Sequence, residues 1–175
     1  GSARKYYRIS GEGGTVIGCI GTNPAENRAF LTIDAKFRDA GLHAPEVYAV
    51  SPDGMAYIQE DLGDGQLFSL LRPGIAKGNF TGEQLDWLHD TIALLPAVQF
   101  KVGQGMDWSV CFPDREFNAR MVNFDLSYFK YDFLKLTGLE FDEIRLQDDF
   151  DRLRDDSLDF KGNTFMYRDF QARNI

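Results

Sequence analysis

The spacing of apolar residues changes near Gly63, and this change constrains the fold more than any other feature of the sequence. Before it, short apolar runs bounded by turn residues predict strands at 6–9, 15–20, 47–50 and 55–59. After it, apolar residues recur at helical spacing and predict helices at 81–95, 117–136 and 147–158. Strands first and helices second indicate an α+β fold with two unlike lobes, 1–63 and 64–175.

Local signals support several of these elements. The glycine-rich segment 10–14 joins the first two strands as a hairpin, and 51–54 forms a turn between the other two. Asn23 followed by Pro24 starts a helix that ends at Gly41, with an apolar stripe at Phe30, Ile33, Phe37 and Ala40. Thr81 with Gln84 has the spacing of a capping box.

Composition favours a packed chain and limits its partners. Aromatic residues make up 14% of the sequence, whereas the net charge is −8 and no basic run occurs. Nucleic acid and anionic membranes are therefore poor partners, and a bound phosphate must meet a local cluster of cations. Two cysteines are too few for a disulfide framework, and no signal peptide or membrane-length apolar run is visible. These features predict a cytoplasmic protein.

The strongest chemical signal lies at the end of the sequence. Asp169 is followed five positions later by Asn174, with Arg168 directly before the Asp and the apolar residues 165–166 leading in as a short strand. This spacing can direct a carboxylate at a hydroxyl group and an amide oxygen at magnesium. Taken alone, the pair is also typical of a polar turn. Together with the upstream segment 60–63, it favours the catalytic interpretation.

In this order the segments resemble the aminoglycoside phosphotransferase and choline kinase superfamily, which has the protein-kinase-like fold. Residues 2–8, 60–64, 128–134 and 167–174 are most similar to bacterial kinases that phosphorylate N-acetylmuramate or N-acetylglucosamine at the anomeric hydroxyl. The resemblance implies ATP between a small sheet lobe and a larger helical lobe, Mg²⁺ as a cofactor, and an amino sugar as the acceptor. Tyr167 stands where this family usually has His, and we expect it to pack beneath the loop.

The same resemblance implies a role for each matching residue. Asp169 would accept the proton of the sugar hydroxyl, and Asn174 would hold magnesium. The remaining residues are the phosphate contacts Ser2, Arg4 and Lys5, the adenine-binding segment Glu60, Asp61 and Leu62, and the substrate or phosphate contacts Gln171 and Arg173. Gly1 and Ser2 match the phosphate loop and equally match an expression tag, and Gln171 and Arg173 have a structural role as their alternative.

Two departures from the kinase pattern leave alternatives open. The strand 15–20 lacks the lysine that binds phosphate in protein kinases, so Arg4, Lys5 and Arg8 become the candidate cations. For the same reason, Glu26 is interpreted as a capping-box residue rather than a partner of such a cation. The alternative functions are a nucleotide-binding regulatory pseudokinase and an aminoglycoside- or choline-type kinase.

The second departure is that the sequence ends before the Asp expected to bind the second metal ion. We interpret the chain as an inactive fragment that lacks part of its larger lobe and self-associates through uncovered helix faces. The residues Phe117, Met121, Phe124 and Tyr128 recur at helical spacing and predict a buried face. The acidic run 148–156 contains Arg152 and Arg154, which is typical of a solvated helix face. His43 and His89 have no metal-binding spacing.

Overall fold

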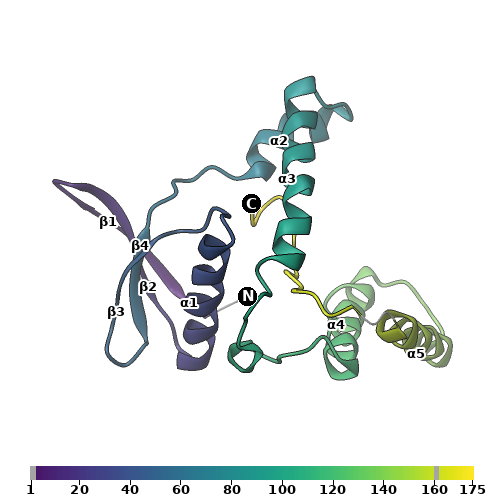
Figure 1. The fold of residues 1–175 in the computed structure, drawn as a ribbon. Coiled ribbons are helices and arrows are strands. Elements are labelled where there is room, and N and C mark those ends of the chain that lie inside the picture. The colour runs from purple at the N-terminus through teal and green to yellow at the C-terminus, as the bar shows by residue number, and fades with distance from the viewer. Residues whose placement is uncertain (1–2, 160–161) are drawn as a thin grey trace. The chain divides into compact units, whose positions relative to one another are not determined.

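The computed structural model describes residues 3–159 and 162–175, and over these ranges the chain is α+β. It contains a four-stranded antiparallel sheet and five α-helices within the described ranges (Figure 1). The chain divides into two compact units, Gly1–Phe112 with Thr164–Ile175, and Pro113–Asn163. Residues on both sides of Gly63 belong to the first unit and share its core.

The sheet has the strand order β1–β2–β4–β3, and the four predicted strands are confirmed to within two residues at each end. Gly11 pairs with Gly14 at the end of the first hairpin. At the second turn the Gly54 N–H donates to the Ser51 carbonyl over 2.9 Å, with Gly54 at φ 69°, a conformation that suits glycine. The strands are β1 (Lys5–Gly11), β2 (Gly14–Ile20), β3 (Val47–Val50) and β4 (Ala56–Glu60).

Helix α1 (Pro24–Asp39) lies across one face of this sheet. The Asn23 side chain caps its first turn by accepting from the Ala25 N–H over 2.9 Å. The Asn27 side chain donates to the Gly54 carbonyl over 2.9 Å, and the Phe30 ring stacks on Tyr57 with centroids 5.2 Å apart. These contacts bury Asn27 and Tyr57 between the helix and the sheet.

Two helices follow the sheet in the first unit, α2 (Leu67–Lys77) and α3 (Gly82–Phe100). The capping box at Thr81 and Gln84 is confirmed by reciprocal hydrogen bonds of 3.3 and 3.1 Å. The Gln84 side chain also donates to the Leu70 carbonyl over 2.8 Å, which ties α3 to α2. The sequence predicted no separate helix at 67–77, where Pro73 interrupts the pattern of helix-forming residues.

A buried cluster of Val98, Val102, Met106 and Phe165 forms the core of the first unit. It joins the end of α3, the loop around the 3₁₀ turn η1 (Trp108–Val110) and the terminal segment. The partly buried residues packed against the cluster are Ile33, Phe37, Ala40, Leu42, Trp108 and Tyr167. The apolar stripe predicted for the first helix is therefore confirmed.

The second unit contains α4 (Ala119–Asp132), the 3₁₀ turn η2 (Leu134–Thr137) and α5 (Glu143–Asp159). Met121 is buried, but Phe124 and Tyr128 are 66% and 64% exposed, so the prediction of one buried aromatic face was wrong for these two residues. Instead, Phe129 packs against Phe133 and Phe150.

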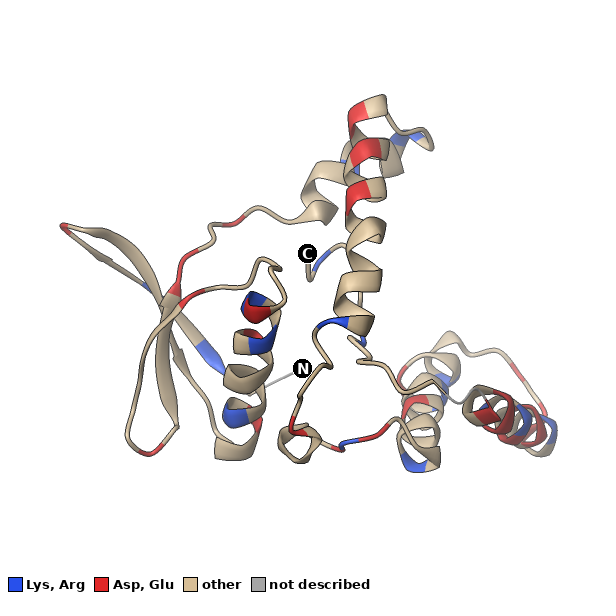
Figure 2. Cartoon of the chain, in the orientation of Figure 1, with Lys and Arg blue, Asp and Glu red and all other residues tan. Residues whose placement is uncertain are grey.

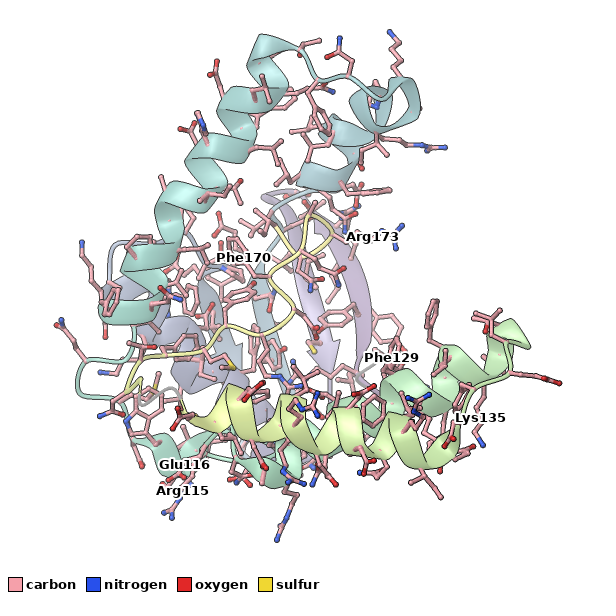
Figure 3. All side chains as sticks on the ribbon, turned by 90° about the vertical axis from the view of Figure 1, so that its right-hand side faces the viewer. Arg115, Glu116, Phe129, Lys135, Phe170 and Arg173 are labelled. Carbon is pink, nitrogen blue, oxygen red and sulfur yellow. The ribbon has the colours of Figure 1, made fainter. Side chains whose placement is uncertain are left out.

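Charged residues lie along the length of α5, which has no buried residue (Figure 2). Arg154 contacts Asp151 at 2.7 Å and Asp155 at 2.8 Å, which confirms a solvated, ion-paired face. Lys135 pairs with Glu143 at 2.8 Å and connects η2 to the start of α5 (Figure 3). Across both described ranges, the helices are too short or too polar to cross a membrane.

Candidate functional site

The structure brings Asp169, predicted as the catalytic base, and Asn174, predicted as a metal ligand, together on a single turn of the terminal segment. The Asn174 side-chain nitrogen donates to the Asp169 backbone carbonyl over 2.9 Å. The Asn174 backbone N–H donates to the Gln171 carbonyl over 2.8 Å and closes the turn. This hydrogen bond uses the side-chain nitrogen of Asn174 and identifies the other side-chain atom as the oxygen. Oxygen is the ligand atom that magnesium prefers.

The backbone at this turn adopts a conformation that L-residues rarely adopt. Arg168 has φ 54° and Asp169 has φ 43°, both in the left-handed region. Such conformations cost roughly 1–3 kcal/mol each and cluster at functional sites. The turn places the Asp169 side chain on the surface, where it is exposed.

The segment that leads to Asp169 packs on the core but is irregular. The structure has no strand at 165–166, so the prediction of a short strand there was wrong. The Phe165 N–H donates to the Gln99 carbonyl at the end of α3 over 3.0 Å. Tyr167 packs edge-on against both Phe37 and Phe170, as expected for an aromatic residue beneath the loop, and burial raises the pKa of its hydroxyl.

The other end of the segment docks on the first turn of α2. The N–H groups of Leu67 and Phe68 donate to the carbonyls of Ile175 and Ala172 over 2.7 and 2.8 Å. Gln66, at the N-cap of α2, provides no side-chain cap, so the terminal segment satisfies these otherwise unpaired donors. Sequence reasoning missed this contact because α2 was not recognised.

Two predicted substrate contacts take part in this docking. The Arg173 guanidinium lies over the Phe68 ring, 4.4 Å from its centroid, and the Arg173 carbonyl accepts from Gln66 Nε2 over 3.0 Å. Figure 3 shows Arg173 and Phe170 on the same terminal segment. The Gln171 side chain is exposed, while its carbonyl is used in the turn. These contacts of Arg173 hold the terminal segment against the first turn of α2.

The predicted adenine-binding segment follows β4 directly. The Glu60 N–H donates to the Glu46 carbonyl over 2.8 Å within the sheet, so Glu60 cannot offer this donor to a ligand. Leu62 is 64% exposed, and Gly63 has φ 81°. Of the three predicted residues, Leu62 is exposed, whereas Glu60 and Asp61 are partly buried.

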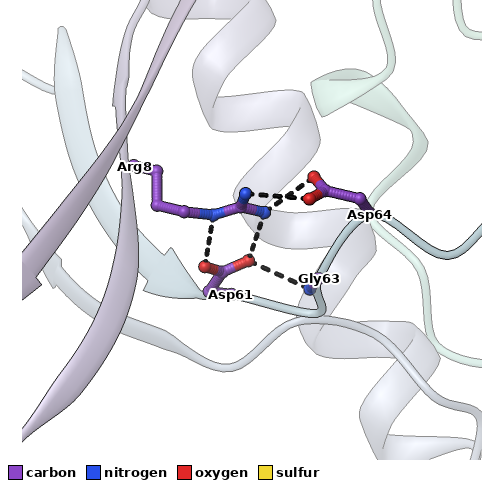
Figure 4. Close-up of polar contacts among 4 residues, drawn as sticks. All are labelled: Arg8, Asp61, Gly63 and Asp64. Atoms are coloured by element: carbon purple, nitrogen blue, oxygen red, sulfur yellow. Dashed lines mark hydrogen bonds and ion pairs between the residues drawn. The ribbon is translucent and has the colours of Figure 1, made fainter.

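Arg8 is held by the same segment. Its guanidinium contacts both carboxylate oxygens of Asp61 at 2.6 and 3.0 Å and both of Asp64 at 3.0 and 2.9 Å (Figure 4). Hydrogen bonds from Arg8 are the main reason why the pKa of Asp61 falls to about 2. The Arg8 guanidinium therefore donates to Asp61 and Asp64, although its sequence position made it a candidate phosphate ligand.

Arg4 has a different partner, which the sequence interpretation did not favour. Its guanidinium lies 3.3 Å from the Glu26 carboxylate and 5.2 Å from the Phe30 ring centroid, and its side chain is only 10% exposed. The interpretation of Glu26 as the partner of a cation is thus supported by geometry. Lys5 opens β1 opposite Ile20, and Ser2 lies outside the described residues.

Within residues 3–159 and 162–175, no group of three or more His, Cys, Asp or Glu side chains could hold a metal ion. A magnesium ion at Asn174 would therefore take further oxygens from a nucleotide and water, as magnesium commonly does at phosphate sites. Comparison with models of protein families, with curated proteins and with solved structures finds no match to this chain. The family resemblance accordingly stays a prediction.

Proposed function

We propose that this chain is the nucleotide-binding and catalytic region of an ATP- and magnesium-dependent phosphotransferase with a protein-kinase-like fold, and that its acceptor is a hydroxyl group of an amino sugar. The observation that carries the proposal is the hydrogen bond from Asn174 Nδ2 to the Asp169 carbonyl. It holds the Asn174 amide against the backbone of Asp169, so the residues that carry the proposed base and metal ligand share one turn, as phosphoryl transfer requires.

Asp169 accepts the proton of the attacking hydroxyl group and orients its oxygen toward the γ-phosphate. The exposed position of the Asp169 side chain suits this role, because the acceptor must reach it from solvent. Asn174 Oδ1 is the group that would hold magnesium, which when bound neutralises charge on the phosphates. Asp169 and Asn174 thus supply a base and a metal ligand from a single short turn.

Chain connectivity supports a nucleotide-binding segment near this turn. Leu62 is four residues from Gln66, whose side chain bonds to the Arg173 carbonyl. Four residues span at most roughly 14 Å, so Leu62 cannot lie far from the terminal segment. An ATP molecule whose adenine binds at Asp61 and Leu62 is long enough to bring its phosphates toward Asp169.

Arg4 takes the place of the lysine that β2 lacks. The Glu26 carboxylate and the Phe30 ring hold its guanidinium at the sheet face covered by α1. Lys5, the first residue of β1, is the other predicted cation, but side chains alternate along a strand and place it on the opposite face of the sheet from Arg4. Arg8 is excluded from this role because two carboxylates occupy its donors.

One observation favours a second candidate, a nucleotide-binding regulatory module. The strand β2 (Gly14–Ile20) contains no lysine, so phosphate binding depends on cations outside the usual position. An aminoglycoside- or choline-type kinase differs from the first candidate only in its acceptor. A cytoplasmic location and a nucleotide plus a small molecule as partners belong to all three candidates.

ATP consumption by the full-length protein, measured across a panel of amino sugars, aminoglycosides and choline, separates these candidates. The first candidate predicts turnover with an amino sugar that depends on added magnesium. Binding of ATP without turnover for any acceptor supports the regulatory module. Absence of ATP binding contradicts all three.

A further inference from the structure

We propose that Arg8 is a positioning residue for the nucleotide, because it fixes the segment 60–64 in the backbone shape that binds adenine. This inference rests on the proposed function and names the group that prepares its nucleotide site. Arg8 faces Ile17 on β2, and Ile17 faces Gln59 on β4. The Arg8 side chain therefore reaches across β2 from β1 to the residues that follow β4 (Figure 4).

The Asp61 carboxylate that contacts Arg8 also binds the backbone of the same segment. Asp61 accepts from Arg8 Nε over 2.6 Å and from Nη2 over 3.0 Å, and its side chain is only 6% exposed. Its Oδ1 also accepts the Gly63 N–H over 2.9 Å. Gly63 has φ 81°, so the carboxylate that Arg8 holds also stabilises the turn after Leu62.

Asp64 fixes the far end of the same segment. It accepts from Arg8 Nη1 over 3.0 Å and from Nη2 over 2.9 Å, although its side chain is 86% exposed. A single planar guanidinium therefore holds both ends of 61–64. The ammonium group of lysine cannot form two such paired contacts at once.

Because Arg8 holds both ends of 61–64 before the ligand binds, the segment loses less conformational entropy on binding. The backbone groups of Asp61 and Leu62 are then presented in one arrangement. Because Arg8 contacts carboxylates and not the reacting atoms, its effect should appear in nucleotide affinity and not in the chemical step.

The test compares Arg8→Lys with Arg154→Lys in the full-length protein. Arg154 is a matched control, because it also contacts two carboxylates, Asp151 and Asp155, but on α5 in the second unit. We expect Arg8→Lys to raise the Kd and the KM for ATP about tenfold, with kcat within about twofold and the KM for the acceptor unchanged. Arg154→Lys should leave all of these values unchanged.

Asp64→Asn provides a second variant that weakens the exposed contact and keeps the pair with Asp61. It should raise the KM for ATP about two- to threefold, and it replaces Arg8→Lys as the deciding variant if Arg8→Lys does not fold. A wild-type protein that binds no ATP overturns the proposed function and this inference together. A wild-type protein that binds ATP, with folded variants that bind it equally well, overturns the inference alone. A lower Tm with an unchanged KM for ATP assigns Arg8 a purely structural role and also overturns it.

Discussion

Phe165 packs edge-on against Phe37, with ring centroids 5.8 Å apart, so the segment that carries Asp169 rests on α1. Phe165 is 6% exposed and belongs to the core cluster, whereas its neighbour Met166 is 53% exposed. The support of the candidate catalytic turn is therefore part of the hydrophobic core of the first unit.

Phe165→Ala should lower the free energy of unfolding by about 3–5 kcal/mol, the range for removing a buried phenyl ring and leaving a cavity. Met166→Ala is the control and should change it by less than about 1 kcal/mol, since exposed side chains contribute little. Urea denaturation followed by circular dichroism measures both values. Equal losses for the two variants would contradict the packing described for Phe165.

Arg173→Ala should lower the free energy of unfolding by about 0.5–1 kcal/mol through loss of the contact with the Phe68 ring. Arg115→Ala is the control, because Arg115 is 69% exposed and forms an ion pair with its equally exposed neighbour Glu116 at 3.6 Å. Denaturation midpoints give the comparison. If Arg173 contacts phosphate instead, the variant will keep its stability and show a higher KM for ATP.

Stability should depend on Asp61 at acid pH. Its pKa is lowered from 3.8 to about 2, mainly by hydrogen bonds from Arg8, so its ionised form favours the folded state. That contribution is complete above about pH 4 and is lost as the pH falls toward 2. The wild type should therefore exceed Asp61→Asn in stability at pH 5, and the difference should shrink by pH 2. A difference that is constant over this range would show that the carboxylate is not ion-paired.

In the full-length protein, Asp169→Asn should reduce kcat by about 10² to 10⁴, the usual effect of removing a general base, because the amide cannot accept the proton. The Asp169 contact with Asn174 uses the backbone carbonyl, so we expect the variant to fold and bind ATP normally. Asp86→Asn, an exposed residue on α3, is the control for a change of charge. An unchanged rate for Asp169→Asn would remove Asp169 from the mechanism.

Local signals predicted most of the fold. The strands, the cap at Asn23 and the capping box at Thr81 depend on residues close together in the chain, and all are present in the structure. Helix α2 was missed because Pro73 lies inside it, and its first turn is completed by distant carbonyl groups. The exposure of Phe124 could not be predicted, because helical spacing identifies a face but not the element that covers it.

The candidate site shows the same contrast. The spacing of Asp169 and Asn174 sufficed to place both on one turn, since that contact is local. Arg8 and Asp61 lie far apart in the sequence and meet only because β1, β2 and β4 are neighbours in the sheet. The partner of Arg4 was likewise set by α1 crossing the sheet, which periodicity alone could not reveal.

The hydrogen bonds from α2 to Ala172 and Ile175 also bear on the order of synthesis. Helix α2 leaves the ribosome long before these two residues, with α3 and the entire second unit translated in between. The N–H groups of its first turn are therefore paired with water until Ala172 and Ile175 emerge. The nascent chain can complete this docking only after the second unit has been translated.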